Sequence, residues 1–514
     1  MSNRPIVGAI IVLGVVLLYG ILRTSSLLPH RLHEDTRITL RLAHWNLHAG
    51  QREAYDALIS EYEALHPDIR VLQLPVPVRA WPAWQQTQLI GGTAPDIMQI
   101  GANRGATDAT IARFFLPLTR EATQPNPYNQ GSSLEGRPWR DTFFDGLTSD
   151  WVFFPALQDI HGIPTQLMSL RFYYNSDLLR LVTGSDQMPA HLDEFKALHA
   201  ATRRFQQQSQ RPVLTLAGSG DYGSFLTTRI LASHTSDLRM KLDHRKILTQ
   251  SSLANLISHL NREWSLDRPE LLQALDVART FGEAMPPGFL QLKRDDAALA
   301  FTQGRAVAMI SGSWDYALLE RECPFPLRVA PLPILQPGMK AVSEAGTQLN
   351  AIFAITRASR HPQQALDLLH YLTSQDAAAR FAFRTQTLPA TVEIPLLNAN
   401  LQIFAPEVSP KLPGLSLSLG PSTAGWFQAN AHRLFAAEST AGTFAQTTSK
   451  AYRDAAIADA SNELSRLRRS SQRDDSVLVA LAHQSEQQMR FDQIATSHIL
   501  REIDIIRLKA TLNR

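Results

Sequence analysis

The sequence predicts an α/β protein built as two lobes, with an apolar segment at its amino end and a helical extension at its carboxyl end. Three observations support this prediction. The chain has 514 residues, which exceeds one ordinary domain. Stretches with helical periodicity are interspersed with short apolar runs that are typical of buried strands. Residues 443–514 contain neither Pro nor Gly, as expected of long helices.

The segment Phe301–Tyr316 shows the α/β pattern in its shortest form. Ala297–Gln303 has the apolar face of a helix end, and Gly304 can adopt the positive φ that stops a helix. Ala306–Ile310 is an apolar run expected for a strand buried on both faces. Trp314 follows a turn at the carboxyl edge of this strand, where ligands bind in open α/β sheets. An indole there would offer a flat apolar platform with one N–H donor.

The first part of the chain also predicts strands and helices in turn. Ile38–Ala43 alternates apolar and polar residues as a strand does, and Gln51–His66 has one apolar helical face. Val71–Val78 is extended, and Pro75 and Pro77 favour an edge strand over a central one. The other elements expected here are a helix over Trp81–Ile90, a buried strand over Ile97–Ile100 and a helix over Thr107–Leu116.

The middle of the chain contains a Gly-rich loop, Gly218–Gly223, that invites comparison with nucleotide sites. It lacks the phosphate-loop pattern G-x-x-x-x-G-K-[ST], so we do not interpret it as one. Thr391–Arg433 is less regular. Other elements expected in this part are strands over Leu170–Tyr174, Arg211–Leu216 and Arg328–Pro333 and helices over Asp193–Gln208, Phe225–Ser265 and Leu271–Met285. Further on, the sequence predicts a helix that begins at Pro362 and a second that Ser374 caps and that ends at Phe383.

Composition excludes several classes of protein. The apolar fraction of 44% is normal for a globular protein, and the net charge of +3 gives no nucleic-acid footprint. Cys323 is the one cysteine, so neither an internal disulfide nor a cysteine metal site is expected. His44 and His48 have i,i+4 spacing but flank a strand end, which makes a metal site there a poor interpretation.

The amino end indicates export. Ile6–Leu22 is an apolar run of about 17 residues between Arg4 and Arg23, at the lower limit for a membrane-spanning helix. We interpret residues 1–23 as an uncleaved signal anchor in the inner membrane, with a cleaved signal peptide as the alternative, and residues 24–36 as a linker. Either interpretation places the folded part on the periplasmic or extracellular side.

Four segments, in order along the chain, resemble family 1 extracellular solute-binding proteins, the maltose-binding-protein-like receptors of carbohydrate-type ABC importers. No single segment is specific for this family, but the occurrence of all four in this order over most of the chain is specific for it. They are Gly92–Met98 with its G-x-x-P-D-hydrophobic pattern, Gly162–Thr165 followed by Phe172–Leu178, Phe301–Tyr316, and Gly346–Thr356.

The resemblance implies a two-lobed, periplasmic-binding-protein-like fold of type II. It places lobe 1 at residues 37–163 and 352–388 and lobe 2 at residues 164–351 and 389–442, with crossings near Pro164 and Asn350. Residues 443–514 depart from the family. We expect one or two amphipathic helices there, which either pack on the lobes or project as a partner-binding arm.

The candidate ligand-binding residues combine aromatic platforms with hydrogen-bonding side chains, because sugars present C–H faces and a rim of hydroxyls. For each Trp, packing in the core is the alternative. The family resemblance implies the roles of Asp96 and Asp221, and capping of nearby N–H groups is the alternative for Asp96. The full set is Trp45, Asn46, Trp81, Asp96, Thr165, Asp221, Trp314, Glu344, Gln348 and Trp426.

The sequence therefore predicts an extracytoplasmic protein that captures a sugar or oligosaccharide in an interlobe cleft and delivers it to an ABC permease. We expect no cofactor and no catalytic residue, since no glycosidase, G-x-S-x-G or H-E-x-x-H signature occurs. A second hypothesis is a membrane-tethered ligand sensor or scaffold with the same fold, suggested by the anchor and the long extension.

Overall fold

The computed structural model describes residues 37–513 apart from 49, 102–107, 150–151, 155–156, 243–251, 337–347, 397, 406–413, 437 and 483–487. The expected anchor (residues 1–23), the linker (residues 24–36) and Glu344 lie outside the described residues. Of the helices that are described, none is both long enough and apolar enough to cross a membrane.

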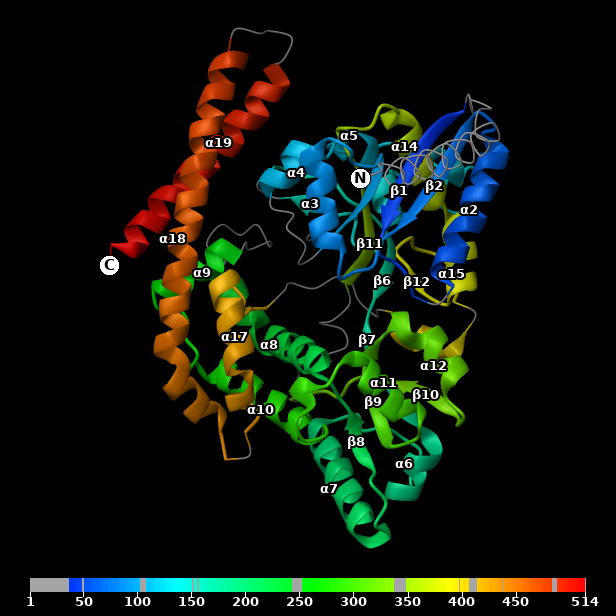
Figure 1. Cartoon of the computed structure of the whole chain (residues 1–514), viewed down its shortest axis with the longest axis vertical. Coiled ribbons are helices and arrows are strands. Elements are labelled where there is room, and N and C mark those ends of the chain that lie inside the picture. The colour runs from blue at the N-terminus through cyan, green and yellow to red at the C-terminus, as the bar shows by residue number, and fades with distance from the viewer. Residues whose placement is uncertain are drawn as a thin grey trace, which may run out of the picture.

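Six strands form the larger sheet, in the order β12-β6-β11-β3-β1-β2. β1 pairs parallel with β2 and β3, whereas β11 runs antiparallel to β3 and β6, and β12 antiparallel to β6. We call this sheet and its helices the first lobe (Figure 1). Its strands are β1 (Ile38–His44), β2 (Ile69–Pro75), β3 (Ile97–Ile100), β6 (Ile163–Met168), β11 (Gln348–Ile355) and β12 (Leu388–Pro389).

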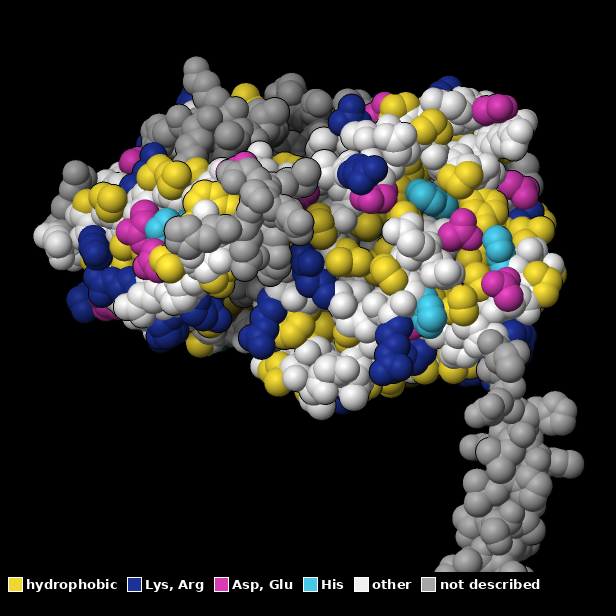
Figure 2. Space-filling view, turned by 90° about the horizontal axis from the view of Figure 1, so that it is seen from above, with side chains coloured by type: hydrophobic (Ala, Val, Ile, Leu, Met, Phe, Trp, Pro, Cys, Tyr) yellow, Lys and Arg dark blue, Asp and Glu magenta, His cyan; other side chains and the backbone are white. Residues whose placement is uncertain are grey.

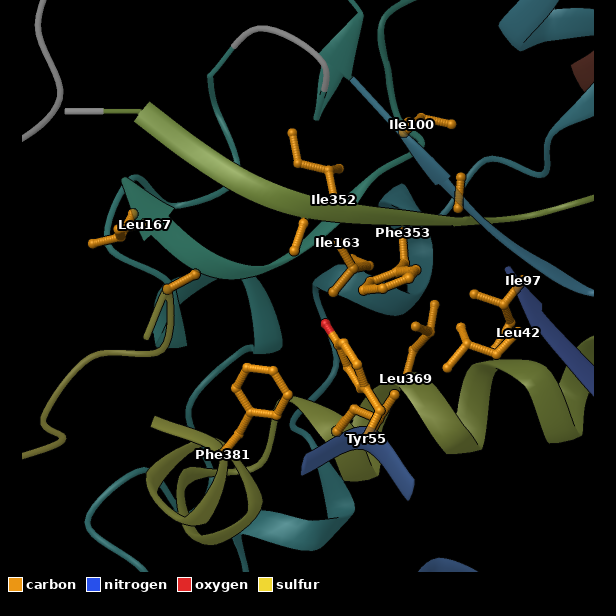
Figure 3. Packing of buried hydrophobic residues seen from close by; sticks show 14 of the residues in the cluster. Leu42, Tyr55, Ile97, Ile100, Ile163, Leu167, Ile352, Phe353, Leu369 and Phe381 are labelled. Atoms are coloured by element: carbon orange, nitrogen blue, oxygen red, sulfur yellow. The ribbon is translucent and has the colours of Figure 1, made fainter. Parts of the chain in front are cut away.

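Helices cover both faces of the six-stranded sheet. Figure 3 shows Tyr55 of α2 between Phe381 of α15 and Phe353 of β11, with Leu369 of α14 beside them. The ring centre of Tyr55 lies 4.7 Å from that of Phe381 and 6.0 Å from that of Phe353. The helical segments of this lobe are α2 (Gln51–Leu65), α3 (Trp81–Gly91), α4 (Asp108–Phe114), α5 (Thr119–Ala122), η1 (Pro127–Asn129), η2 (Trp139–Thr142), α14 (Pro362–Leu372) and α15 (Gln375–Thr385).

The edge position of β2 confirms the interpretation of Pro75. β2 is the outermost strand and pairs only with β1 through its length, and Pro75 is its last residue. A residue without an N–H costs no ladder hydrogen bond at such a place.

Four strands form the smaller sheet, in the order β10-β7-β9-β8. All seven residues of β9 are buried, which confirms the strand expected over Ala306–Ile310 and extends it to Gly312. We call this sheet and its helices the second lobe. Its strands are β7 (Leu170–Asn175), β8 (Leu214–Ala217), β9 (Ala306–Gly312) and β10 (Leu327–Ala330). Its helical segments are α6 (Ser176–Thr183), α7 (Leu192–Ser209), α8 (Gly220–Leu242), α9 (Ser252–Leu260), α10 (Pro269–Glu283), η3 (Phe289–Gln291), α11 (Arg294–Thr302), η4 (Ser313–Asp315), α12 (Tyr316–Glu322), α16 (Ala399–Phe404) and α17 (Pro421–Leu434).

The chain leaves the six-stranded sheet at Ser169 rather than near Pro164. β6 continues past Pro164 because Gln166 and Leu167 pair with β11 on one side and with β12 on the other. β7 then begins at Leu170 in the four-stranded sheet. The second crossing comes before β11, whose paired residues from Gln348 onward all belong to the larger sheet.

Two further expectations were wrong in detail. The Gly-rich segment Gly218–Gly223 is not a loop throughout, because α8 begins at Gly220. Thr391–Arg433 is more regular than expected, since it contains α16 and the 14-residue α17. Pro421 stands at the first position of α17, where its missing N–H and fixed φ are favourable.

The carboxyl-terminal extension forms two long helices, α18 (Ala441–Leu481) and α19 (Gln488–Leu512). The first half of α18 packs on α9, α10 and α17 of the second lobe, and its second half pairs with α19 (Figure 1). The extension therefore does both things that the sequence left open: its beginning joins the body, and its end projects as a helical hairpin.

Asp459 of α18 fixes the extension to the second lobe. Its carboxylate accepts hydrogen bonds from the N–H groups of Ser422 (2.8 Å) and Thr423 (2.9 Å) and from the Thr423 hydroxyl (2.9 Å). These N–H groups lie in the first turn of α17, which has no intrahelical acceptor for them. Tyr452 adds a hydrogen bond from its hydroxyl to the Leu417 carbonyl oxygen, 3.1 Å away.

Candidate functional site

The carboxyl ends of three strands meet at one edge of the six-stranded sheet. β1 and β3 are parallel, and β6 runs in the same direction because β11 lies antiparallel between it and β3. The chain passes from this edge into the second lobe through Ser169. Ligands of open α/β sheets bind at such an edge, so it is the place to look for a site.

A network of uncharged polar side chains occupies this edge. Gln99 Nε2 donates to Asn46 Oδ1 (3.1 Å), and Asn46 Nδ2 donates to Tyr55 Oη (3.4 Å). Tyr55 Oη also lies 3.4 Å from Thr165 Oγ1, which donates to the Ala351 carbonyl oxygen at 3.2 Å. The network joins the loop after β1 to β3, α2, β6 and β11, and it consists of buried amides and hydroxyls without a charged group.

Titratable members of this edge are held neutral. Burial lowers the pKa of His44 to about 4, against the opposing effect of its hydrogen bond with Gln73. Burial also raises the pKa of the Tyr55 hydroxyl, while hydrogen bonds with Thr165 and Asn46 act in the other direction. At neutral pH the imidazole and the phenol are therefore both uncharged.

Trp45 lies beside this network, at the carboxyl end of β1. Its backbone N–H donates to Gln99 Oε1 at 2.9 Å, and its indole is half-buried. The ring contacts Trp81 edge to face, with ring centres 4.9 Å apart. Trp81 is fully buried and also packs against Trp84 at 5.1 Å, so it supports Trp45 from the core.

The second lobe contributes the turn that holds Trp314. Trp314 lies in η4, directly after β9, and its indole is half-buried. A Cβ at Gly312 would overlap the indole, so the ring lies directly over the Gly312 backbone. The guanidinium carbon of Arg294 is 5.8 Å from the centre of this ring.

Asp315 holds the same turn in place through its side-chain contacts. Its carboxylate forms an ion pair with Arg294 and accepts a hydrogen bond from the Ser311 hydroxyl at 2.5 Å. The Gly312 carbonyl oxygen accepts from Tyr173 Oη at 2.8 Å, and the Ser313 N–H donates to the Ser169 carbonyl oxygen at 3.0 Å. These bonds tie the Trp314 turn to the point where the chain crosses between lobes.

His48 is influenced by charged groups of the other half of this region. It belongs to the first lobe, in the loop that carries Trp45 and Asn46. Burial lowers its pKa, the Arg294 guanidinium lowers it further, and the Asp315 carboxylate opposes both effects. Both charged groups belong to the second lobe, so the loop after β1 lies close to the Trp314 turn.

The structure does not bring the other predicted residues into this cluster. Asp96 stands at the amino end of β3, where it accepts hydrogen bonds from the Arg41 N–H (2.8 Å) and the Ser359 hydroxyl (2.6 Å). Trp426 is buried within α17, with its ring centre 4.7 Å from that of Tyr452 in α18. Capping and packing account for these two residues.

For three of the predicted ligand-binding residues, the structure describes the backbone alone or nothing at all. Gln348 is the first residue of β11 and pairs with Met168, so its backbone lies at the site's edge. Asp221 lies in the first turn of α8 rather than in a loop. The side chains of both, and Glu344 altogether, lie outside the described residues.

Sequence reasoning missed Gln99, Tyr55 and Gln166. Gln166 Nε2 lies 3.5 Å from Gln51 Oε1, and all of these side chains are buried. The available signal was a Gln inside an otherwise apolar strand, Ile97–Ile100, because a buried amide needs partners.

Two hollows on the described surface are lined by residues other than those of the candidate site. One of about 380 Å³ is lined by Glu61, Tyr128, Tyr371 and Arg380 of the first lobe, among others. Another, of about 650 Å³, lies along α18 near Arg473. Within the described part of the chain, His, Cys, Asp and Glu side chains form no group of three or more that suits a metal ion.

Two sheets that meet at a crossing point, with hydrogen-bonding side chains gathered there, form the architecture of a two-lobed solute-binding protein. Residues 57–404 match the family described as bacterial extracellular solute-binding protein, and the chain belongs to this family. The family resemblance found in the sequence is thereby confirmed, and the family places the chain outside the cytoplasm. None of the curated proteins compared with the chain matches it.

Several solved structures have the same fold. A protein studied for xylan utilization by Caldanaerobius polysaccharolyticus is 16% identical, with a TM-score of 0.58 over 80% of this chain and 99% of that one. A cyclo/maltodextrin-binding protein complexed with maltotetraose is 18% identical, with a TM-score of 0.57 over 82% and 98%. A maltose-binding periplasmic protein from Listeria monocytogenes, in complex with maltose, is 17% identical, with a TM-score of 0.56 over 82% and 98%.

Proposed function

We propose that the chain captures a neutral sugar or oligosaccharide between its two lobes and delivers it to an ABC permease. The observation that carries this proposal is the uncharged network of Asn46, Gln99 and Thr165 at the edge that faces the Trp314 turn. Amides and hydroxyls match the hydroxyl rim of a sugar, and an indole matches its C–H face. The structural neighbours named for maltose and maltotetraose support the same ligand class.

The proposed binding residues are those near the interlobe edge. Trp314 and Trp45 would supply aromatic platforms, and Asn46 and Thr165 would hydrogen-bond to ligand hydroxyls. We add Gln348, whose backbone starts β11 at this edge. Glu344 and Asp221 stay predictions. Trp81, Asp96 and Trp426 are left out because packing and capping occupy them.

Capture would proceed by closure of the lobes about the crossings. A ligand closes the lobes only if it binds the closed state better than the open one. His48 lies close to Arg294 and Asp315, so an approach of the lobes brings the loop after β1 against the Trp314 turn. Contacts made from both sides at once would give that difference in affinity.

A ligand screen tests the carbohydrate assignment. We expect one or a few neutral sugars to raise the melting temperature of the protein by mass action, and to do so less in Trp314→Ala. Phe383→Ala, which removes an aromatic ring that is 71% exposed on α15, is the control and should keep the response. If only polyamines or anions raise the melting temperature, the sugar assignment is wrong while the family assignment stands.

We further propose that the apolar run Ile6–Leu22 holds the protein at the inner membrane, beside the permease. Membrane fractionation with amino-terminal sequencing checks this. An intact amino terminus in the membrane fraction is expected, and a terminus that begins beyond Arg23 in the soluble fraction would show cleavage instead.

A further inference from the structure

Three isoleucines form an exposed stripe on α19. Ile499, Ile503 and Ile506 are 59%, 38% and 62% exposed, whereas Ile505 and Leu508 on the opposite face are almost fully buried. The buried face packs against α18 and α9. The helix is therefore apolar on two faces, and only one of them has a partner among the described residues.

The stripe has the spacing of a coiled-coil seam. Steps of four and then three residues separate Ile499, Ile503 and Ile506, which puts them at d, a and d of a heptad, and Ala510 takes the next a position. The pattern lasts about two heptads, which is too short for a long supercoil but sufficient for a local helix pair.

Charges on one flank of the seam complement each other across an antiparallel pair. Glu502 and Lys509 both occupy g positions, and g faces g in antiparallel coiled coils. With Ile503 packed against Ile506 of a second helix, Glu502 of one helix meets Lys509 of the other, twice by symmetry. Glu502 also accepts a hydrogen bond from Ser471 of α18, and Lys509 has no carboxylate partner within the described chain.

We propose that α19 pairs antiparallel with α19 of a second copy of this chain, with the isoleucine stripe as the core of the interface. The hairpin projects from the body in Figure 1, and Figure 2 views the molecule from the end at which it projects. An isologous contact of this kind closes on itself and makes a dimer. An anionic membrane surface fits less well, because the flank carries Glu502 beside Lys509.

The contact is small, so the dimer is reversible. A stable interface buries about 800 Å² on each partner, and three isoleucines with one alanine supply less than that. Sedimentation velocity of the full chain, in one detergent throughout, should show a mass that rises from monomer to dimer over roughly a hundredfold range of concentration.

Point variants distinguish this specific interface from nonspecific association of the protein. Ile503→Asp should abolish the dimer, and Lys509→Glu should weaken it because two Glu side chains then face each other. The double variant Glu502→Lys with Lys509→Glu should restore it. Leu65→Asp, at an apolar residue that is 61% exposed on α2, is the control and should dimerise like the parent.

Several outcomes would overturn the proposal. They are a parent chain that stays monomeric throughout, a dimer that survives Ile503→Asp, and a dimer indifferent to Lys509→Glu, which would exclude the antiparallel arrangement. The parent chain could instead bind anionic vesicles without self-association, and Ile503→Asp could abolish that binding. This result would show that the isoleucine stripe binds a membrane surface. Unchanged melting temperatures of the variants show that each effect belongs to the interface.

Discussion

Gly312 and Trp314 form the most closely fitted pair in the candidate site. The backbone of Gly312, at φ −89° and ψ 165°, is open to any residue, so only the overlap of a Cβ with the indole excludes a side chain there. We predict that Gly312→Ala displaces the Trp314 ring and weakens ligand binding by about tenfold, or about 1.4 kcal/mol. Isothermal titration calorimetry with the sugar found by screening measures this.

Gly91→Ala is the matched control for this substitution. A Cβ at Gly91 meets only the Thr93 hydroxyl, at 3.7 Å, and Gly91 does not require a positive φ. Its affinity for ligand should equal that of the parent. Equal affinities of Gly312→Ala and the parent would show that the Trp314 ring takes no part in binding.

Buried histidines give the fold a dependence on pH. Burial is the largest cause that lowers the pKa of each of four histidines to about 4, while an unfolded chain has a histidine pKa of about 6.5. Below about pH 6.5 these histidines are therefore protonated in the unfolded state but not in the folded state. The stability of the fold decreases as the pH is lowered from about 6.5 to about 4. The four are His44, His161, His259 and His370.

We predict that one such histidine contributes about 1.4 kcal/mol of lost stability per pH unit across this window. Guanidinium unfolding at a series of pH values, for the parent and for His161→Gln, isolates its share from that of the carboxylates. The free energy of unfolding should fall less steeply with decreasing pH in the variant. Parallel curves would show that His161 titrates alike in the folded and unfolded chains.

At the scale of single residues, sequence reasoning placed Trp314 and Asn46 just after strands, as the structure does, and their part in ligand binding stays a prediction. The same reasoning placed Trp426 with them because Thr391–Arg433 was expected to be irregular, whereas Trp426 lies inside α17. Gln99 escaped notice because its partners are about 50 residues away or more in the sequence. A buried amide network depends on strand pairing, which no local pattern reveals.

At the scale of elements, Asp459 turns an apparent appendage into part of the second lobe. Its carboxylate serves two N–H groups and one hydroxyl at the start of α17. We predict that Asp459→Ala lowers the free energy of unfolding by about 2 kcal/mol, because buried donors lose their acceptor. Denaturant unfolding monitored by circular dichroism measures the loss.

Asp454→Ala provides the comparison for this variant. It removes the same type of side chain from the same helix, but at a position that is 63% exposed and that forms a surface ion pair with Lys450. Its stability should stay within about 0.5 kcal/mol of the parent. A similar loss in both variants would assign the effect to helix propensity rather than to the cap.

Elements with their own local signal were predicted well, and the others were not. β9 is a continuous apolar run and β2 carries Pro75 at an edge, so both were found. β6 was not predicted, and a crossing near Pro164 was expected in its place, because this strand depends on β11 and β12, which come about 180 residues later or more. Partners so distant leave no trace in a window of neighbouring residues.

At the scale of the whole molecule, the proposed function requires the lobes to approach each other. We predict that the radius of gyration, measured by small-angle X-ray scattering, falls when the sugar found by screening is added at saturation. Trp314→Ala at the same sugar concentration should keep the larger value. An unchanged radius in the saturated parent would mean that capture needs no closure.

Length and the order of four motifs predicted the two-lobed likeness, since both are properties of the whole chain. The division of the extension was not predicted. Its first half differs from its second by Asp459, Tyr452 and other contacts with α9, α10 and α17, which are visible only once the chain has folded.

Two of the connections between the lobes leave the larger sheet from neighbouring strands, β6 and β11. Met168 lies opposite Gln348, so these two exits stand side by side, about 5 Å or one strand spacing apart. A hinge this narrow lets the second lobe rotate relative to the first about one axis, and it resists other relative movements of the two lobes. A cross-link between Met168 and Gln348 positions would leave the swing free, whereas one placed far from this line would lock the molecule.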